Sequence, residues 1–186
     1  MGQLVGIERP IDLDTVRARA LGGAVAALDR LAPTMPRRVQ RLFAALGGPT
    51  AELGVARRVA PRVAAHCAAL VRDCEQAQTV LLASGRRVPR AAEVEGEMAL
   101  ARAILAVCAM IEEPGDPADP FTPLDLGLNA VPYHLNMAQA RLAEATRLKI
   151  EDRIALAQAA VREARATAMA RVLPAEEVGD GRRIGA

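Results

Sequence analysis

The longest uninterrupted pattern of apolar and polar positions runs from Tyr133 to Leu173, between Pro132 and Pro174. No Gly or Pro lies inside it, and apolar residues recur at intervals of three and four, which places them on one helix face. At a rise of about 1.5 Å per residue, the stretch predicts a helix roughly 60 Å long. Its apolar row consists of Leu135, Ala138, Leu142, Ile150, Ile154, Ala157, Val161, Ala164, Ala168 and Val172, with Thr146 in the one gap.

The C-terminal part of this row resembles a heptad seam, except that every second position is alanine. Burying a large aliphatic side chain is worth roughly 1.5–3 kcal/mol, and burying Ala is worth much less. An isolated two-stranded coil on this seam would therefore be weak. We expect the seam to need a broader partner surface, either the chain's own helices or another subunit. The expected interface residues are Ile150, Ile154, Val161 and Val172.

Shorter apolar rows before Tyr133 predict further helices. The first begins at a cap formed by Asp12 or Asp14 and ends at Pro33. Its expected inner row is Leu13, Val16, Ala20, Ala24, Ala27 and Leu31. Gly22 and Gly23 lie in its middle, where each costs about 1 kcal/mol, so either the helix breaks there or another backbone crosses closely.

The next expected helix is Met35–Leu46, followed by a short helix that begins at Thr50 and is interrupted by Pro61. Two longer helices are expected after it, one from about Ala60 to Ser84 and one from about Ala92 to Glu113. The helix from Ala60 has the row Val63, Cys67, Leu70, Cys74, Ala77 and Leu81. The helix from Ala92 is apolar on two sides, which is typical of a central helix buried among several neighbours.

Five prolines and several acidic residues predict an irregular connection over residues 114–132, with a short helix at Thr122–Asp125. This connection is either functional or a plain crossover. Residues 1–11 are expected to be a flexible arm and residues 174–186 a disordered tail. Residues 12–173 then form a single helical domain. Its parts are basic N-terminal helices with the central helix (12–113), the connection (114–132) and the long helix (133–173).

Composition supports this reading of the pattern. The chain of 186 residues is 52% apolar, yet it has 40 alanines and only three aromatic residues, Phe43, Phe121 and Tyr133. Alanine is the best helix former, while the β-branched and aromatic residues that favour sheets are sparse. We therefore expect an all-α, Ala-rich bundle of about five to six helices, built along one long C-terminal helix.

Charge is distributed unevenly along the chain. Residues 1–92 hold 14 arginines against 7 acidic residues, whereas residues 93–186 hold 10 basic against 15 acidic residues. The two halves are expected to attract each other, within one molecule or between copies. An alternative is that the basic half binds the phosphate backbone of a nucleic acid in a salt-dependent way. The candidate phosphate contacts are Arg37, Arg38, Arg41, Arg57, Arg58 and Arg62.

The sequence offers few residues for catalysis. Ser84 is the only serine and lacks the G-x-S-x-G turn, and neither a P-loop nor a dinucleotide-binding glycine motif occurs. The only local cluster of metal-ligating residue types is His66, Cys67, Asp73 and Cys74, which leaves a metal- or thiol-dependent enzyme as a further alternative. These side chains diverge on the predicted helix, which is poor geometry for one tetrahedral metal site. Because Cys67, Cys74 and Cys108 have apolar surroundings, we expect buried, reduced thiols. No catalytic residue, metal ligand, cofactor or small-molecule substrate is predicted.

These patterns together favour a non-enzymatic helical protein that is a subunit or adaptor of a larger assembly. Its expected partners are itself or other protein subunits, with nucleic acid as the alternative. The most apolar run, from Met98 to Ile111, is shorter than the roughly 20 residues that a membrane-spanning helix needs. No signal peptide is visible at the N-terminus, so the expected location is the cytoplasm.

Overall fold

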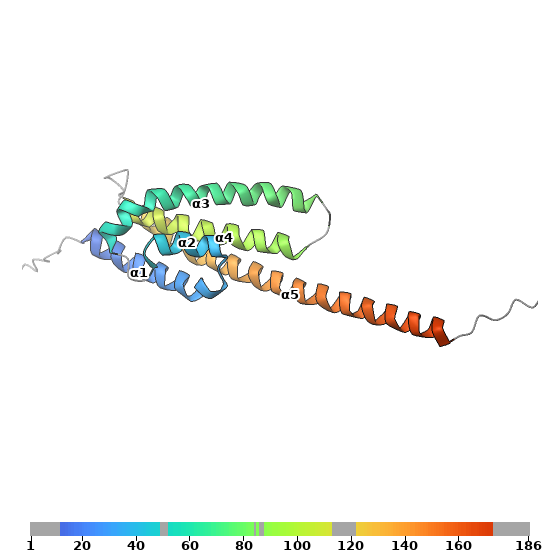
Figure 1. Ribbon diagram of the computed structural model, residues 1–186. Helices are drawn as coiled ribbons and strands as arrows, with labels where there is room; N and C mark the ends of the chain where they lie inside the picture. The colour runs from blue at the N-terminus through green and yellow to red at the C-terminus, as the bar shows by residue number, and fades with distance from the viewer. Residues whose placement is uncertain (1–11, 49–51, 84, 86–87, 113–121, 173–186) are drawn as a thin grey trace, which may run out of the picture. The chain divides into compact units, whose positions relative to one another are not determined.

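The computed structural model describes residues 12–48, 52–83, 85, 88–112 and 122–172, and no strand occurs among them. They form an all-α bundle with a long C-terminal helix, which confirms the predicted fold class. The elements are α1 (Leu13–Leu31), the 3₁₀ helix η1 (Ala32–Thr34), α2 (Arg37–Ala45), α3 (Leu53–Leu82), α4 (Pro89–Ile111) and α5 (Thr122–Val172) (Figure 1). The chain forms two compact units, Met1–Thr146 and Arg147–Ala186.

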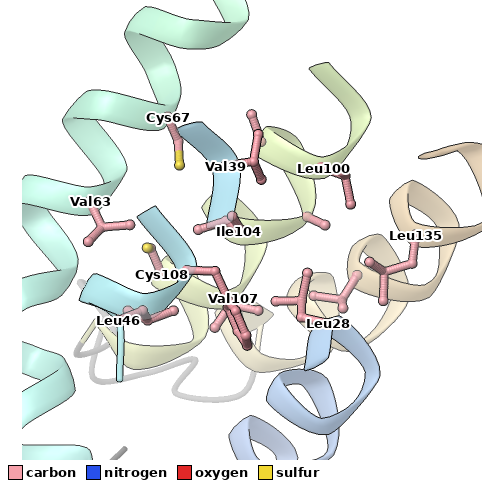
Figure 2. Close-up of a cluster of buried hydrophobic side chains, with 14 of the residues drawn as sticks. Leu28, Val39, Leu46, Val63, Cys67, Leu100, Ile104, Val107, Cys108 and Leu135 are labelled. Atoms are coloured by element: carbon pink, nitrogen blue, oxygen red, sulfur yellow. The ribbon is translucent and has the colours of Figure 1, made fainter. Parts of the chain in front are cut away.

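Helix α4 is the centre of the first unit. It runs beside α3 in the opposite direction (Figure 1), and most of its residues are buried. Around it lie side chains from the four other helices of this unit (Figure 2). The labelled residues are Leu28 of α1, Val39 and Leu46 from the region of α2, Val63 and Cys67 of α3, Leu100, Ile104, Val107 and Cys108 of α4, and Leu135 of α5. The prediction of a central core helix is confirmed.

The buried face of α1 differs from the predicted row. Asp12 caps this helix as expected, because its side chain accepts a hydrogen bond from the Asp14 amide at 3.1 Å. The buried apolar residues are Leu21, Val25 and Leu28 rather than Val16 and the alanines. The larger side chains occupy the core because they remove more apolar surface from water, and the predicted row is rotated to the edge of the core.

Helix α3 is continuous where the sequence predicted an interruption. Pro61 lies inside it, so the expected separate short helix and the new helix start near Ala60 are both wrong. An interior proline removes one backbone hydrogen bond and costs about 3 kcal/mol. Here one buried row continues through the proline, with Ala56 and Ala60 before it and Val63 after it. Packing on both sides therefore outweighs the local penalty.

The predicted connection over residues 114–132 is helical from Thr122 onward, because α5 begins there. Pro132, which was expected to end the connection just before the long helix, lies inside α5. Residues 1–11, most of the predicted connection and the tail at 174–186 lie outside the described residues. Residues 12–173 as a single domain stay a prediction.

Glycines allow α4 and α5 to approach closely at two places. A Cβ atom added at Gly127 of α5 would lie 2.1 Å from Met110 Cγ and 3.3 Å from the Ala106 carbonyl oxygen of α4. A Cβ added at Gly96 of α4 would lie 2.8 Å from the Leu142 side chain. Since real carbon atoms do not come that close, either the Met110 and Leu142 side chains or the helices themselves would have to move to admit a methyl group.

We expect the Gly127→Ala variant to lower the free energy of unfolding by about 1–3 kcal/mol, the usual cost of overpacking a core. Urea unfolding followed by circular dichroism measures it. Gly22→Ala is the matched control, because a Cβ there meets no atom within 4 Å. That variant should stabilise the protein by about 0.4–1 kcal/mol, since alanine restricts the unfolded chain. Equal effects of the two variants would show that α4 and α5 do not approach closely at Gly127.

The three cysteines are buried in the core, as predicted. Burial raises the pKa of Cys67 to about 11 and the pKa of Cys108 to about 12, and it also raises the pKa of Cys74. Each thiol therefore stays protonated in the folded chain at a pH where it would ionise in the unfolded chain. Since the thiolate is the reactive form, these cysteines should react slowly with thiol reagents until the protein unfolds.

The same shifts predict how stability depends on pH. Between about pH 9 and pH 11 the unfolded chain binds fewer protons than the folded chain, so the free energy of unfolding should fall as pH rises. The expected slope is about 1.4 kcal/mol per pH unit for each thiol that ionises only on unfolding. Urea unfolding under reducing conditions measures it. In Cys108→Ala, the free energy of unfolding should fall less steeply with pH, by the contribution of one thiol. An unchanged slope would contradict the raised pKa of Cys108 as a cause of the pH dependence.

Candidate interaction surface

The C-terminal part of α5 carries an exposed apolar row. Ile150, Ile154 and Val161 are 53%, 51% and 52% exposed, and all residues over 149–169 are exposed. The row is completed at helical spacing by Ala157, Ala164 and Ala168. Three of the four predicted interface residues therefore share one open face, while the side chain of Val172 lies outside the described residues. We call the row from Ile150 to Ala168 the seam.

Polar groups beside the seam support the helix itself. Arg147 Nη1 lies 2.8 Å from Glu151 Oε1, one turn further along the helix. The Thr167 hydroxyl donates a hydrogen bond to the Glu163 carbonyl oxygen at 2.9 Å. An exposed ion pair at this spacing is worth about 0.3–0.5 kcal/mol. Such pairs sustain a solvated helix, but they leave the apolar row uncovered.

A second candidate surface is a groove of mixed polarity between α1 and the first part of α5. Its volume is about 630 Å³, within the range of small-molecule sites. Alanines and Leu31 of α1 face Leu128, Val131 and Leu135 of α5, and Arg19 and Arg30 also contribute to the lining. Of the predicted inner row of α1, the residues that line this groove are Ala20, Ala24, Ala27 and Leu31.

The glycine pair of α1 fits neither of the two structures expected for it. The helix continues through Gly22 and Gly23 without a break. No described backbone crosses there either, because a Cβ at either position would meet no atom within 4 Å. Gly23 instead lines the groove. Both expectations are wrong, and within the described residues the space above this glycine is open.

A smaller pocket of about 210 Å³, lined by both polar and apolar side chains, lies among α3, α4 and the first part of α5. Its main ion pair joins Arg141 Nε to Glu95 Oε2 at 2.7 Å, and Arg141 also contacts Glu144 at 2.9 Å. Burial lowers the pKa of His134 in this pocket, and the Arg102 guanidinium lowers it further. The histidine is therefore held neutral at pH 7. The carboxylate that lines this pocket, that of Glu95, binds Arg141 and so connects α4 to α5 electrostatically.

The arginines proposed as phosphate contacts are divided between two helices. Arg37, Arg38 and Arg41 lie on α2, and Arg57, Arg58 and Arg62 lie on α3. Among the residues that the structure describes, two of the six form ion pairs. Arg38 pairs with Glu97 of α4, and Arg57 Nη2 lies 2.7 Å from Asp14 Oδ1 of α1. The other four are exposed.

The pair between Arg38 and Glu97 is the feature of the basic half that the sequence analysis missed. The Glu97 side chain is only 8% exposed, and Arg90 Nη1 lies 3.5 Å from its second oxygen. The Arg38 guanidinium also lies 3.6 Å from Cys74 Sγ. The available signal is a glutamate three residues after Val94, on the same face of α4 as that buried valine. These contacts join the basic and acidic halves of the sequence within one molecule.

The cluster of His66, Cys67, Asp73 and Cys74 does not converge on one site. His66 and Asp73 are exposed on α3, whereas Cys67 and Cys74 are buried. Among the described residues no group of three or more His, Cys, Asp or Glu side chains is placed to hold a metal ion. The raised pKa of Cys67 also opposes a thiolate nucleophile at neutral pH.

No helix within the described parts of the chain is long and apolar enough to cross a membrane. Comparison with protein-family models, with curated proteins and with solved structures gives no match to this chain. The seam, the groove and the paired charges are therefore the features from which a function has to be argued.

Proposed function

We propose that this chain is a non-enzymatic helical interaction protein, a subunit or adaptor of a protein assembly, that binds another protein chain through the seam of α5. The observation that carries the proposal is the exposure of Ile150, Ile154 and Val161 on a single helix face. Single exposed apolar residues are ordinary, but a contiguous apolar surface marks an interaction site.

The spacing of the seam defines the kind of partner it fits. Intervals of four and three keep one apolar row facing a neighbouring helix over several turns. Full burial of an Ile or Val side chain is worth roughly 1.5–3 kcal/mol, and about half of each of these side chains is exposed, so a partner helix would recover part of that value. The alanines between them allow that helix to approach closely. A partner helix that runs along α5 therefore suits this face better than a small molecule.

Nucleic-acid binding is the alternative function. Its support is the exposure of the other four arginines of α2 and α3, which form no ion pair within the described residues. Against it, Arg38 and Arg57 are directed to carboxylates of the same chain. A long side chain that already has a carboxylate partner gains little from exchanging it for phosphate.

We expect a photo-reactive amino acid at position 161 to crosslink the full-length chain to another protein chain in the cells that make it. The same residue at position 156 is the matched control, because Leu156 is 71% exposed but lies off the seam. Denaturing electrophoresis and mass spectrometry measure the adducts. Ile154→Asp should remove the adduct at position 161, since a buried unpaired charge is costly.

Circular dichroism should show unchanged helix content in Ile154→Asp, because this position is exposed in the single chain. The proposed function fails if position 161 gives no adduct, or gives the same adducts as position 156.

For the alternative, we expect no electrophoretic shift of DNA or RNA by the purified chain, even at low salt. Phosphate contacts would instead give binding that weakens steeply as salt rises. Arg41→Gln and Arg58→Gln probe the exposed arginines without disturbing the Arg38 and Arg57 pairs. A salt-sensitive shift that both variants weaken would favour nucleic-acid binding over the proposed function.

A further inference from the structure

We infer that the partner of the seam is a second copy of this chain, paired antiparallel so that every large seam residue faces an alanine. The inference rests on the proposed function and names its partner. It follows from the order of large and small residues along the seam and from the charges beside it.

The spacing fixes the heptad positions along the exposed part of α5. Ile154, Val161 and Ala168 occupy the a positions, and Ile150, Ala157 and Ala164 occupy the d positions. The large residues therefore cluster toward the N-terminal end of the seam, with alanines toward its C-terminal end.

A parallel pair in register does not suit this order of residues. Each layer would join identical residues, so Ile150 and Ile154 would meet their own copies while Ala157, Ala164 and Ala168 would face alanine. The isoleucine layers would hold the two helices apart, so the layers of two alanines would leave a gap between them. Such a pair would contain cavities, which cost stability.

An antiparallel pair resolves the mismatch. In that orientation each a position faces a d position of the other chain. Ile154 meets the partner's Ala164, Val161 meets the partner's Ala157, and Ile150 meets the partner's Ala168. Each of these layers occurs twice by symmetry, and each joins one large and one small side chain. The separation between helices is then even along the seam.

Charges beside the seam favour the same orientation. In an antiparallel pair the e positions of the two chains face each other, and here they are Glu151, Gln158 and Arg165. Glu151 faces the partner's Arg165, Gln158 faces the partner's Gln158, and Arg165 faces the partner's Glu151. One oxygen of Glu151 binds Arg147 in its own chain, and a carboxylate has a second oxygen for the partner.

The other flank is compatible with this register. Its g positions are Arg153, Ala160 and Thr167, so Arg153 faces the partner's Thr167 and Ala160 faces the partner's Ala160. No like charges meet on either flank over these positions. Shifting the register by one heptad would place Glu151 opposite the partner's Gln158, so the pairs with Arg165 would be lost. It would also place Ile150 opposite the partner's Val161, which joins two large side chains in one layer. The charge pairs and the size pairs therefore select one alignment.

Cysteine crosslinking of the full chain tests the orientation. A Glu151→Cys chain mixed with an Arg165→Cys chain should form a mixed disulfide, because the two positions face each other. In a parallel pair they would be about 21 Å apart along the axis. Ala160→Cys alone should form a homodimer, and Ala159→Cys, which points outward, should not. The buried native thiols do not compete. The antiparallel orientation is overturned if Glu151→Cys and Arg165→Cys chains form no mixed disulfide. It is also overturned if Ala159→Cys forms a disulfide-linked homodimer as readily as Ala160→Cys does.

Charge reversal tests the flanking pairs by sedimentation equilibrium. Glu151→Arg and Arg165→Glu each place like charges at both pairs, so either variant should weaken dimerisation roughly tenfold. The double variant should restore the wild-type dissociation constant to within about threefold. Because it does not restore the Arg147 contact, rescue reports on the contact between chains. A double variant as weak as the single variants overturns the alignment.

The outcomes separate this inference from the function on which it rests. A chain that stays monomeric at all concentrations, yet crosslinks through position 161 to a different protein, overturns the second copy and keeps the proposed function. A monomer with no adduct at position 161 overturns both. A dimer with the mixed disulfide and the rescue supports both.

Discussion

Close approach to α4 is the constraint on which the first unit depends. A chain with 40 alanines and three aromatic residues cannot fill wide spaces between helices, so its core forms only where backbones come near each other. Helix α4 meets this requirement with buried alanines on several sides, and with Gly96 and Gly127 where α5 packs against it. The large buried side chains of α4, such as Leu100 and Ile104, then complete a core that alanine alone would leave weak.

The sequence predicted those elements in which burial and periodicity agree. The row of α3 from Val63 to Cys74 and the all-round burial of α4 follow from spacing alone, and both are confirmed. Prediction failed where a local rule competed with packing. Pro61 is a helix breaker by local rules, but buried residues on both sides hold α3 in one piece. On α1 a row of alanines had the right period, but larger residues one position along were buried instead.

The candidate surface could be predicted only in part. Spacing identified Ile150, Ile154 and Val161 as one face, but a periodic row reads the same whether it is buried in its own chain or exposed to another. Only the structure separates Leu135 and Ala138, which are buried, from the exposed residues further along the same helix. The groove of α1 was not predictable, because it depends on contacts between residues far apart in sequence. The position of Glu97 on the inner face of α4 signals a buried carboxylate, but the sequence does not identify Arg38 as its partner.

The proline inside α3 divides this helix into parts of unequal strength. Pro61 has no amide hydrogen to donate to the Arg57 carbonyl, so the turns from Leu53 to Ala60 are joined to the rest of the helix by fewer hydrogen bonds. These turns depend on the buried Ala56 and Ala60 and on the ion pair from Arg57 to Asp14 of α1. We therefore expect local opening to begin in this part of α3 together with α1, while the hairpin of α3 and α4 keeps the core closed.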